Sequence, residues 1–136
     1  MDEIKNYRYK VWLKQADFDF SAALCSCDAG FYEWTTFQAE QSAEKALKAL
    51  LAYLGVKPPK LHSLSILTKM IHKIDKKCLL NIKLKSLQTF TFTSRYPFII
   101  PGDNMTPHEI IELEDAQESI EECRKIIESV KIYING

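Results

Sequence analysis

The chain has 136 residues, of which 46% are hydrophobic and 26% are charged, as is usual for a soluble globular protein. Its 18 basic and 18 acidic side chains give a formal net charge of zero, so it lacks the strong basic excess that is typical of nucleic-acid-binding domains. We expect a cytoplasmic protein, because the N-terminus has no signal-like segment and no apolar run approaches the roughly 18 residues of a membrane span.

The first half of the chain predicts two long helices. Apolar side chains recur at intervals of three and four over residues 7–29 and again over residues 31–54. Gly30 and Gly55 follow these segments, in the position where glycine commonly ends a helix. Because so little chain joins them, the two helices should pack antiparallel as a helical hairpin.

Shorter elements are predicted after a proline break. Pro58 and Pro59 cannot continue a helix, since proline lacks the backbone donor that a helix needs. Ser63 can then cap a third helix, whose apolar positions lie within residues 64–74. Further apolar positions predict a fourth helix over residues 76–91, with a threonine-rich end.

The last third of the chain predicts a long loop and a long helix. Residues 94–107, SRYPFIIPGDNMTP, show no regular pattern, and loops of this length are often functional. Apolar positions from Ile110 to Val130 predict the last helix, with a frayed start. The whole predicts an all-α fold in a single domain, residues 1–136. We expect an up-and-down bundle of about five helices with a long irregular loop before the last helix.

The second predicted helix carries a polar stripe. Gln38, Gln41, Lys45 and Lys48 follow one another at helical spacing, about opposite the leucine positions. In one interpretation the stripe is a solvated face, where Glu44 and Lys48 form an i,i+4 pair worth a few tenths of a kcal/mol. In the other it is one wall of an anion-binding site. The sequence leaves both interpretations open.

Another side of the same helix carries small residues. Ala39, Ala43, Ala46 and Ala49 would let a neighbouring backbone approach closely. A dimer interface and a cleft between helices of one chain fit this pattern equally well.

The loop before the last helix contains a candidate anion ligand, Arg95. Its planar guanidinium suits bidentate recognition of phosphate or carboxylate, and the chain has only two other arginines. The same group could instead tie down the loop. Tyr96 precedes Pro97 and should be extended, which fixes the direction of Arg95.

The three histidines give one candidate. His62 lies just before the predicted cap of the third helix, where backbone N–H groups favour an anion. It can serve as an acid, a base, an anion ligand or a structural hydrogen-bonding residue. His72 and His108 have no partner at ligand spacing, so we expect them at the surface.

We expect no metal and no cofactor. Cys25 and Cys27 would point to opposite sides of a helix, and Cys78 and Cys123 stand alone in the sequence, so free thiols are predicted. The motifs for phosphate loops, dinucleotide binding, zinc proteases and serine hydrolases are all missing from the sequence.

These residues resemble the HEPN domain family. The similarity is carried by AEQSAEKALKAL (residues 39–50), LHSL (61–64) and RYP (95–97), and it extends over nearly the whole chain. The resemblance implies an up-and-down helical bundle that is commonly dimeric and often paired with a minimal nucleotidyltransferase, as in toxin–antitoxin systems. Nucleotide binding has been proposed for this family.

The resemblance also bears on catalysis. Many members of the family are metal-independent ribonucleases, in which an arginine is followed four to six residues later by a histidine. No arginine in this chain is followed by a histidine at that spacing, since the first histidine after Arg95 is His108.

Our leading hypothesis is a homodimeric helical module that binds a nucleotide or another phosphorylated ligand beside a nucleotidyltransferase partner. One alternative is a metal-independent ribonuclease or toxin that uses His62 and Arg95, and another is a purely structural dimerisation module. RNA is an open partner that the neutral charge does not support, and no membrane partner is expected. The predicted ligand-binding residues are Lys45, His62, Arg95, Gln38, Gln41, Lys48 and Tyr96.

Overall fold

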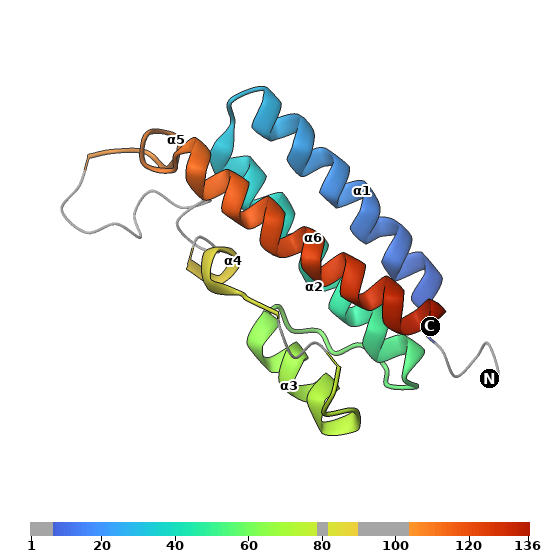
Figure 1. Cartoon of the computed structure of the whole chain (residues 1–136). Helices are drawn as coiled ribbons and strands as arrows, with labels where there is room; N and C mark the ends of the chain where they lie inside the picture. Colours follow the sequence, from blue (N-terminus) through green and yellow to red (C-terminus); the bar gives the residue numbers. More distant parts are fainter. Residues whose placement is uncertain (1–6, 79–81, 90–103) are drawn as a thin grey trace.

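The computed structural model describes residues 7–78, 82–89 and 104–136, and these residues form helices and connections but no strand. The all-α fold class is therefore confirmed (Figure 1). Six helices are described, against the expected five or so. They are α1 (Tyr9–Asp28), α2 (Tyr32–Tyr53), α3 (Leu64–Ile74), α4 (Lys85–Thr89), α5 (Pro107–Ile110) and α6 (Leu113–Asn135).

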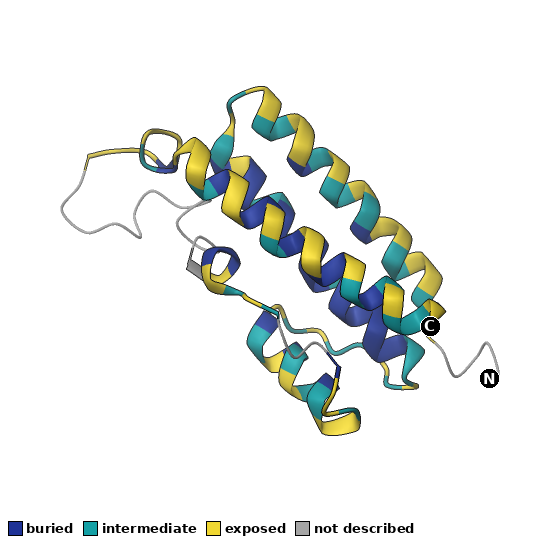
Figure 2. Ribbon diagram, viewed as in Figure 1, coloured by how far each residue is buried: buried dark blue, intermediate teal, exposed yellow. Residues whose placement is uncertain are grey.

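Helix α2 is the centre of the fold. It contacts each of the other five helices, and 15 of its 22 residues are buried. Helices α1, α2 and α6 lie side by side along their lengths, and α6 runs antiparallel to α1 (Figure 1). Figure 2 shows the buried residues concentrated on α2 and on the facing sides of α1 and α6.

Glycines end the first two helices as predicted. Gly30 has a φ of 84°, and the N–H of Phe31 reaches back to the carbonyl of Ser26 at 2.9 Å, which reverses the chain at once. Gly55 has a φ of 87° in the equivalent position after α2. The helical hairpin of α1 and α2 is therefore confirmed, and its helices begin and end within two residues of the predicted bounds.

The alanines of α2 are used inside a single chain. Ala39, Ala43, Ala46 and Ala49 are fully buried, and the neighbouring Ser42 hydroxyl donates to the carbonyl of Ala16 on α1 at 2.6 Å. Close approach of a neighbouring backbone is therefore confirmed. The dimer-interface interpretation of these alanines is wrong, because α1, α6 and the shorter helices already cover them.

The third helix has the predicted cap and the fourth is much shorter than predicted. The Ser63 hydroxyl accepts from the N–H of Ile66 at 3.3 Å at the start of α3. Residues 76–78 and 82–84 are not helical, because Asp75 ends α3 with a turn in which its carboxylate accepts from the N–H of Lys77 at 3.0 Å. Helix α4 begins only where Glu122 of α6 accepts from the N–H of Ser86, also at 3.0 Å.

The last predicted helix is split in two. Thr106 and Glu109 form a capping box around Pro107 at the start of α5. Glu112 is extended and forms a second capping box with Asp115 at the start of α6. The start that we expected to fray is thus a separate capped turn followed by a new helix.

Most of the predicted irregular loop, residues 94–103, lies outside the described residues; residues 104–106 precede α5, which begins at Pro107. Within the described part of the chain, no helix is both long and apolar enough to cross a membrane.

Candidate functional site

Three of the four residues of the polar stripe on α2 are occupied by contacts inside the fold. Lys45 forms an ion pair with Asp19 of α1, and the Gln38 amide lies 2.6 Å from the Ser26 hydroxyl. Gln41 donates to the carboxylate of Glu40 at 3.2 Å. Gln38 and Lys45 therefore hold α2 against α1, and none of the three lines the cavity described below.

Lys48 and its partner are buried rather than solvated. The Lys48 ammonium donates to Glu44 Oε2 at 3.2 Å, and the two side chains are only 6% and 5% exposed. The interpretation of this pair as a solvated surface contact is therefore wrong. A charge pair removed from water is costly to break, because either partner left alone is an uncompensated buried charge.

His62 shares the same carboxylate. Its Nδ1 lies 2.9 Å from Glu44 Oε1, while its ring is 76% exposed. Glu44 therefore joins His62, on the segment before α3, to Lys48 on α2. With Nδ1 held by a buried carboxylate, His62 Nε2 is the ring nitrogen left for an external group.

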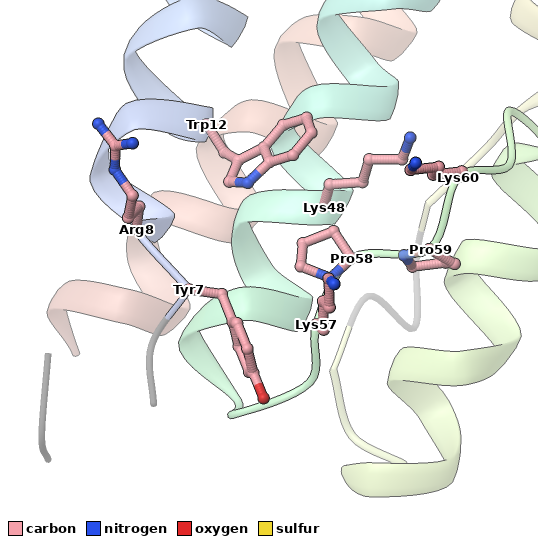
Figure 3. A pocket seen from close by; sticks show the side chains of 8 residues that line it. All are labelled: Tyr7, Arg8, Trp12, Lys48, Lys57, Pro58, Pro59 and Lys60. Carbon is pink, nitrogen blue, oxygen red and sulfur yellow. The ribbon is translucent and has the colours of Figure 1, made fainter. Parts of the chain in front are cut away.

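A cavity of about 700 Å³ lies beside Lys48, between the start of α1, the last turns of α2 and the segment that follows α2. Figure 3 shows the side chains that line it. We call it the Lys48 cavity. Its lining residues are Tyr7, Arg8, Trp12, Lys48, Lys57, Pro58, Pro59 and Lys60.

The Lys48 cavity combines flat apolar groups with cations. The Lys48 ammonium lies 5.6 Å from the centre of the Trp12 ring, a cation–π contact, and Pro58 and Pro59 add apolar surface. Lys57 and Lys60 are exposed. Among the described residues, no acidic side chain lines the cavity. This arrangement suits an anion that carries a flat ring.

The backbone at the start of α1 positions two further lining residues. Tyr7 and Arg8 have φ values of 48° and 59°, in the left-handed region that non-glycine residues rarely adopt. Each such residue costs on the order of 1–3 kcal/mol and persists only where its surroundings impose it. No sequence pattern indicates this conformation, so neither Tyr7 nor Arg8 was among the predicted site residues.

A second histidine is paired at the other end of α2. His108 Nδ1 lies 2.9 Å from Glu33 Oε2, and its ring packs against Phe31 with 5.8 Å between centres. His108 is exposed as predicted, but it has a partner that sequence spacing did not reveal. His72 is half-buried, contrary to the expected surface position, and within the described chain its Nε2 has no hydrogen-bonding partner.

The buried glutamates are the residues that sequence reasoning missed. Glu33, Glu40 and Glu44 are 6%, 2% and 4% exposed and lie on one face of α2. Their spacing was a usable signal, because Lys48 continues the same face. Arg95 and Tyr96 lie outside the described residues, so the structure does not place them relative to this face.

All four cysteines are free thiols. Cys25 is exposed and Cys27 half-buried on α1, whereas Cys78 and Cys123 are buried. Burial raises the pKa of Cys123 to about 12 and that of Cys78 to about 11. In the described residues no group of three or more His, Cys, Asp or Glu side chains could hold a metal ion.

Comparison with protein families decides where this fold belongs. The model of the HEPN domain matches residues 9–133, from the start of α1 to the last turn of α6. The chain belongs to the HEPN domain family. In this HEPN domain the matched residues include all six described helices apart from the last two residues of α6.

Individual relatives agree with this assignment. Over 137 aligned residues the HEPN domain is 26% identical to the toxin candidate MJ1304 of Methanocaldococcus jannaschii, covering 95% of this chain and 90% of that protein. The crystal structure of TT1696 from Thermus thermophilus superposes with a TM-score of 0.75 at 26% identity, over 92% of this chain and 97% of that one. The archaeal HEPN homologue ST0689 has a TM-score of 0.66 at 30% identity, over 93% of this chain and 98% of that one.

Proposed function

We propose that this HEPN domain binds a nucleotide or another phosphorylated ligand in the Lys48 cavity. One observation carries the proposal: a cavity of about 700 Å³ brings the Trp12 ring together with exposed Lys57 and Lys60, and none of its described lining residues is acidic. The volume lies within the range of small-molecule sites, roughly 300–1,000 Å³. The membership of the chain in the HEPN family supports the same class of ligand.

The chemistry of the lining gives each part of a nucleotide a partner. A base can stack on Trp12, a contact worth about 1–3 kcal/mol in single-strand recognition. Lys57 and Lys60 can donate to phosphate oxygens, and a hydrogen bond to a charged group contributes about 1.5–3 kcal/mol. Lys48 is held by Glu44, so it contributes as a fixed positive charge. Such contacts together are consistent with micromolar affinity.

The proposal is tested by calorimetric titration of nucleoside mono-, di- and triphosphates into the wild-type protein and two variants. Lys57→Gln/Lys60→Gln removes two lining charges and should weaken binding about tenfold, which corresponds to 1.4 kcal/mol. Lys10→Gln/Lys14→Gln removes two exposed charges of α1 outside the cavity and should leave affinity unchanged. Equal weakening in both variants, or no heat with any ligand, would contradict the proposal.

A second candidate function is metal-independent ribonuclease or toxin activity at His62. The supporting observation is the 2.9 Å contact of His62 Nδ1 with buried Glu44, which orients the ring as in a general acid or base. Arg95 would supply the phosphate contact in this candidate. Cleavage of mixed-sequence RNA in excess EDTA, lost in His62→Gln, would support it; intact RNA beside an active control ribonuclease would reject it.

Assembly is part of the proposal. We propose a homodimer and a nucleotidyltransferase partner, as the family resemblance implies, in the cytoplasm, where free thiols such as those seen here persist. Val11 and Phe18 are 53% and 59% exposed, lie two turns apart on α1, and offer an apolar stripe for such a contact. Sedimentation equilibrium tests this dimer. The wild type should be dimeric and Val11→Ser/Phe18→Ser should be monomeric, and a monomeric wild type contradicts the proposal.

A further inference from the structure

His62 is connected to the Lys48 cavity although its own side chain does not line it. Its Nδ1 lies 2.9 Å from Glu44 Oε1, and the second oxygen of the same carboxylate accepts from the Lys48 ammonium at 3.2 Å. Lys48 lines the cavity and lies 5.6 Å from the centre of the Trp12 ring (Figure 3). One carboxylate therefore connects an exposed histidine with a cation of the cavity lining.

The three connected side chains differ sharply in burial. The Glu44 and Lys48 side chains are 5% and 6% exposed, whereas the His62 ring is 76% exposed. The ring can therefore exchange protons with water directly. Salt screens buried charges much less than exposed ones, so a change of charge on His62 acts on Glu44 and Lys48 through their direct contacts.

The summed charge of these side chains depends on the histidine. Glu44 and Lys48 form an ion pair of opposite charges, so the three side chains sum to zero when His62 is neutral. They sum to +1 when His62 is protonated, and two cations then share the Glu44 carboxylate. Histidine is the side chain that ordinarily changes its charge between pH 5 and 8, whereas an ordinary lysine stays protonated over that range.

The charged groups around His62 come from two elements. From α2, Glu44 contacts the ring directly and Lys48 is bound to the same carboxylate. On the segment that carries His62, exposed Lys60 precedes it by two residues. The first turn of α3, residues 64–67, contains no ionisable side chain. Glu44 is therefore the acidic group through which a charge on His62 can act on the cavity.

We propose that His62 is a positioning residue of the Lys48 cavity, which strengthens the binding of a phosphorylated ligand when its ring is protonated. A protonated ring forms a charge-assisted hydrogen bond with Glu44, so that less of the Lys48 charge is neutralised by this carboxylate. A neutral ring leaves the carboxylate to Lys48. The inference rests on the proposed function and adds a dependence on pH to the same site.

Helix α2 also supplies a matched control. His108 Nδ1 lies 2.9 Å from Glu33 Oε2, the His108 ring is 56% exposed and the Glu33 side chain 8% exposed. This pair repeats the contact of His62 with Glu44, but Glu33 and Lys48 are 15 residues apart on α2, roughly 22 Å along the helix. His108→Gln therefore removes a comparable histidine that is remote from the cavity.

The first test is calorimetric titration of ADP at pH 5.5 and pH 8.0 into the wild type, His62→Gln and His108→Gln. Glutamine keeps a hydrogen-bond donor for Glu44 but cannot take up a proton. The phosphates of ADP titrate equally in every experiment, so the measured quantity is the ratio of wild-type to variant affinity at each pH. For His62→Gln this ratio should be near one at pH 8.0 and about fivefold higher at pH 5.5, the lower end of couplings between sites.

The control defines the contradicting results of this titration. For His108→Gln the ratio of affinities should be the same at both pH values. An unchanged ratio for His62→Gln would overturn the inference, and so would an equal change for His108→Gln. ADP binding in either of these cases would leave the proposed function standing, whereas no binding by any of the proteins would reject the proposed function as well.

A second test needs no ligand. Because the Lys48 ammonium lies over the Trp12 ring, a changed Lys48–Glu44 contact should alter the Trp12 emission. In a Trp34→Phe background, emission followed from pH 5 to 8 should show a transition that His62→Gln abolishes and His108→Gln keeps. Such a transition without ADP binding would keep the link between His62 and Lys48 and reject the cavity as a nucleotide site. A transition that persists in His62→Gln would assign the titration to another group and overturn the inference.

Discussion

At the scale of single residues, Glu44 is the most important contact of the candidate site, because it binds both Lys48 and His62. One carboxylate accepts from the buried Lys48 ammonium through Oε2 and lies against the exposed His62 ring through Oε1. It therefore fixes a positive charge beside the Lys48 cavity and orients a histidine at the same time. The sequence showed the i,i+4 spacing of Glu44 and Lys48, but spacing alone does not tell whether a pair is covered by other helices.

Replacing Glu44 should therefore be costly. Glu44→Gln leaves the Lys48 ammonium, which is 6% exposed, without its counter-charge, and breaking a buried pair from one side costs about 3–5 kcal/mol. Glu121→Gln is the matched control, because Glu121 pairs with Arg124 and both side chains are about half exposed. It should change stability by less than about 1 kcal/mol. Urea unfolding of the two variants measures the difference, and equal costs would contradict the buried pair.

The buried thiols should make stability fall at alkaline pH. The pKa of Cys123 is raised from 9.0 to about 12 by burial, so the unfolded chain loses this proton first. The free energy of unfolding is therefore unaffected below about pH 9 and decreases as pH rises toward 12. Cys123→Ala should flatten this decrease, whereas Cys25→Ala, at an exposed thiol, should not. Urea unfolding of the wild type and the two variants at pH 7, 9 and 10.5 tests this prediction. An identical decrease of the free energy of unfolding with pH in all three proteins would refute it.

At the scale of elements, the sequence predicted α1, α2 and α3 well because their ends are marked locally. Gly30, Gly55 and Ser63 each act on the backbone within a few residues. The prediction of the fourth helix was wrong for the opposite reason. Glu122, far along the chain, accepts from the backbone N–H of Ser86 at the start of α4. Capping by a distant residue leaves no local signal.

The central position of α2 predicts low tolerance of larger side chains. Ala46 is fully buried, so Ala46→Leu should overpack the helix contacts and cost about 1–3 kcal/mol. Gln117→Leu, on the exposed side of α6, should stay within about 0.5 kcal/mol of the wild type. Thermal unfolding compares the two. An unfolding temperature of Ala46→Leu equal to that of the wild type would contradict the close packing of α2 at this position.

At the scale of the whole molecule, the candidate site joins segments that sequence patterns treat separately. The Lys48 cavity takes Trp12 from α1, Lys48 from α2 and Lys60 from the segment after α2. Of the predicted site residues, Lys48 lines this cavity and His62 connects to it through Glu44. Gln38, Gln41 and Lys45 make contacts inside the fold.

The distribution of charge along the sequence is uneven, with eight lysines and one acidic residue in residues 57–85, and the zero total hides it. Composition sums over the chain, whereas the field at a surface depends on which charges lie together. Counting charge by predicted element reveals this distribution.

The most direct test of the account follows the fluorescence of Trp12 during nucleotide titration. The chain has two tryptophans, so Trp34→Phe leaves Trp12 as the single reporter, and the Trp34 side chain is 47% exposed and lies outside the lining of the cavity. A nucleotide stacked on Trp12 should quench the Trp12 fluorescence until the site is saturated. The affinity obtained from this quenching should be about tenfold lower in Lys57→Gln/Lys60→Gln. Unchanged Trp12 emission at saturating concentrations of every nucleotide would contradict a ligand in the Lys48 cavity.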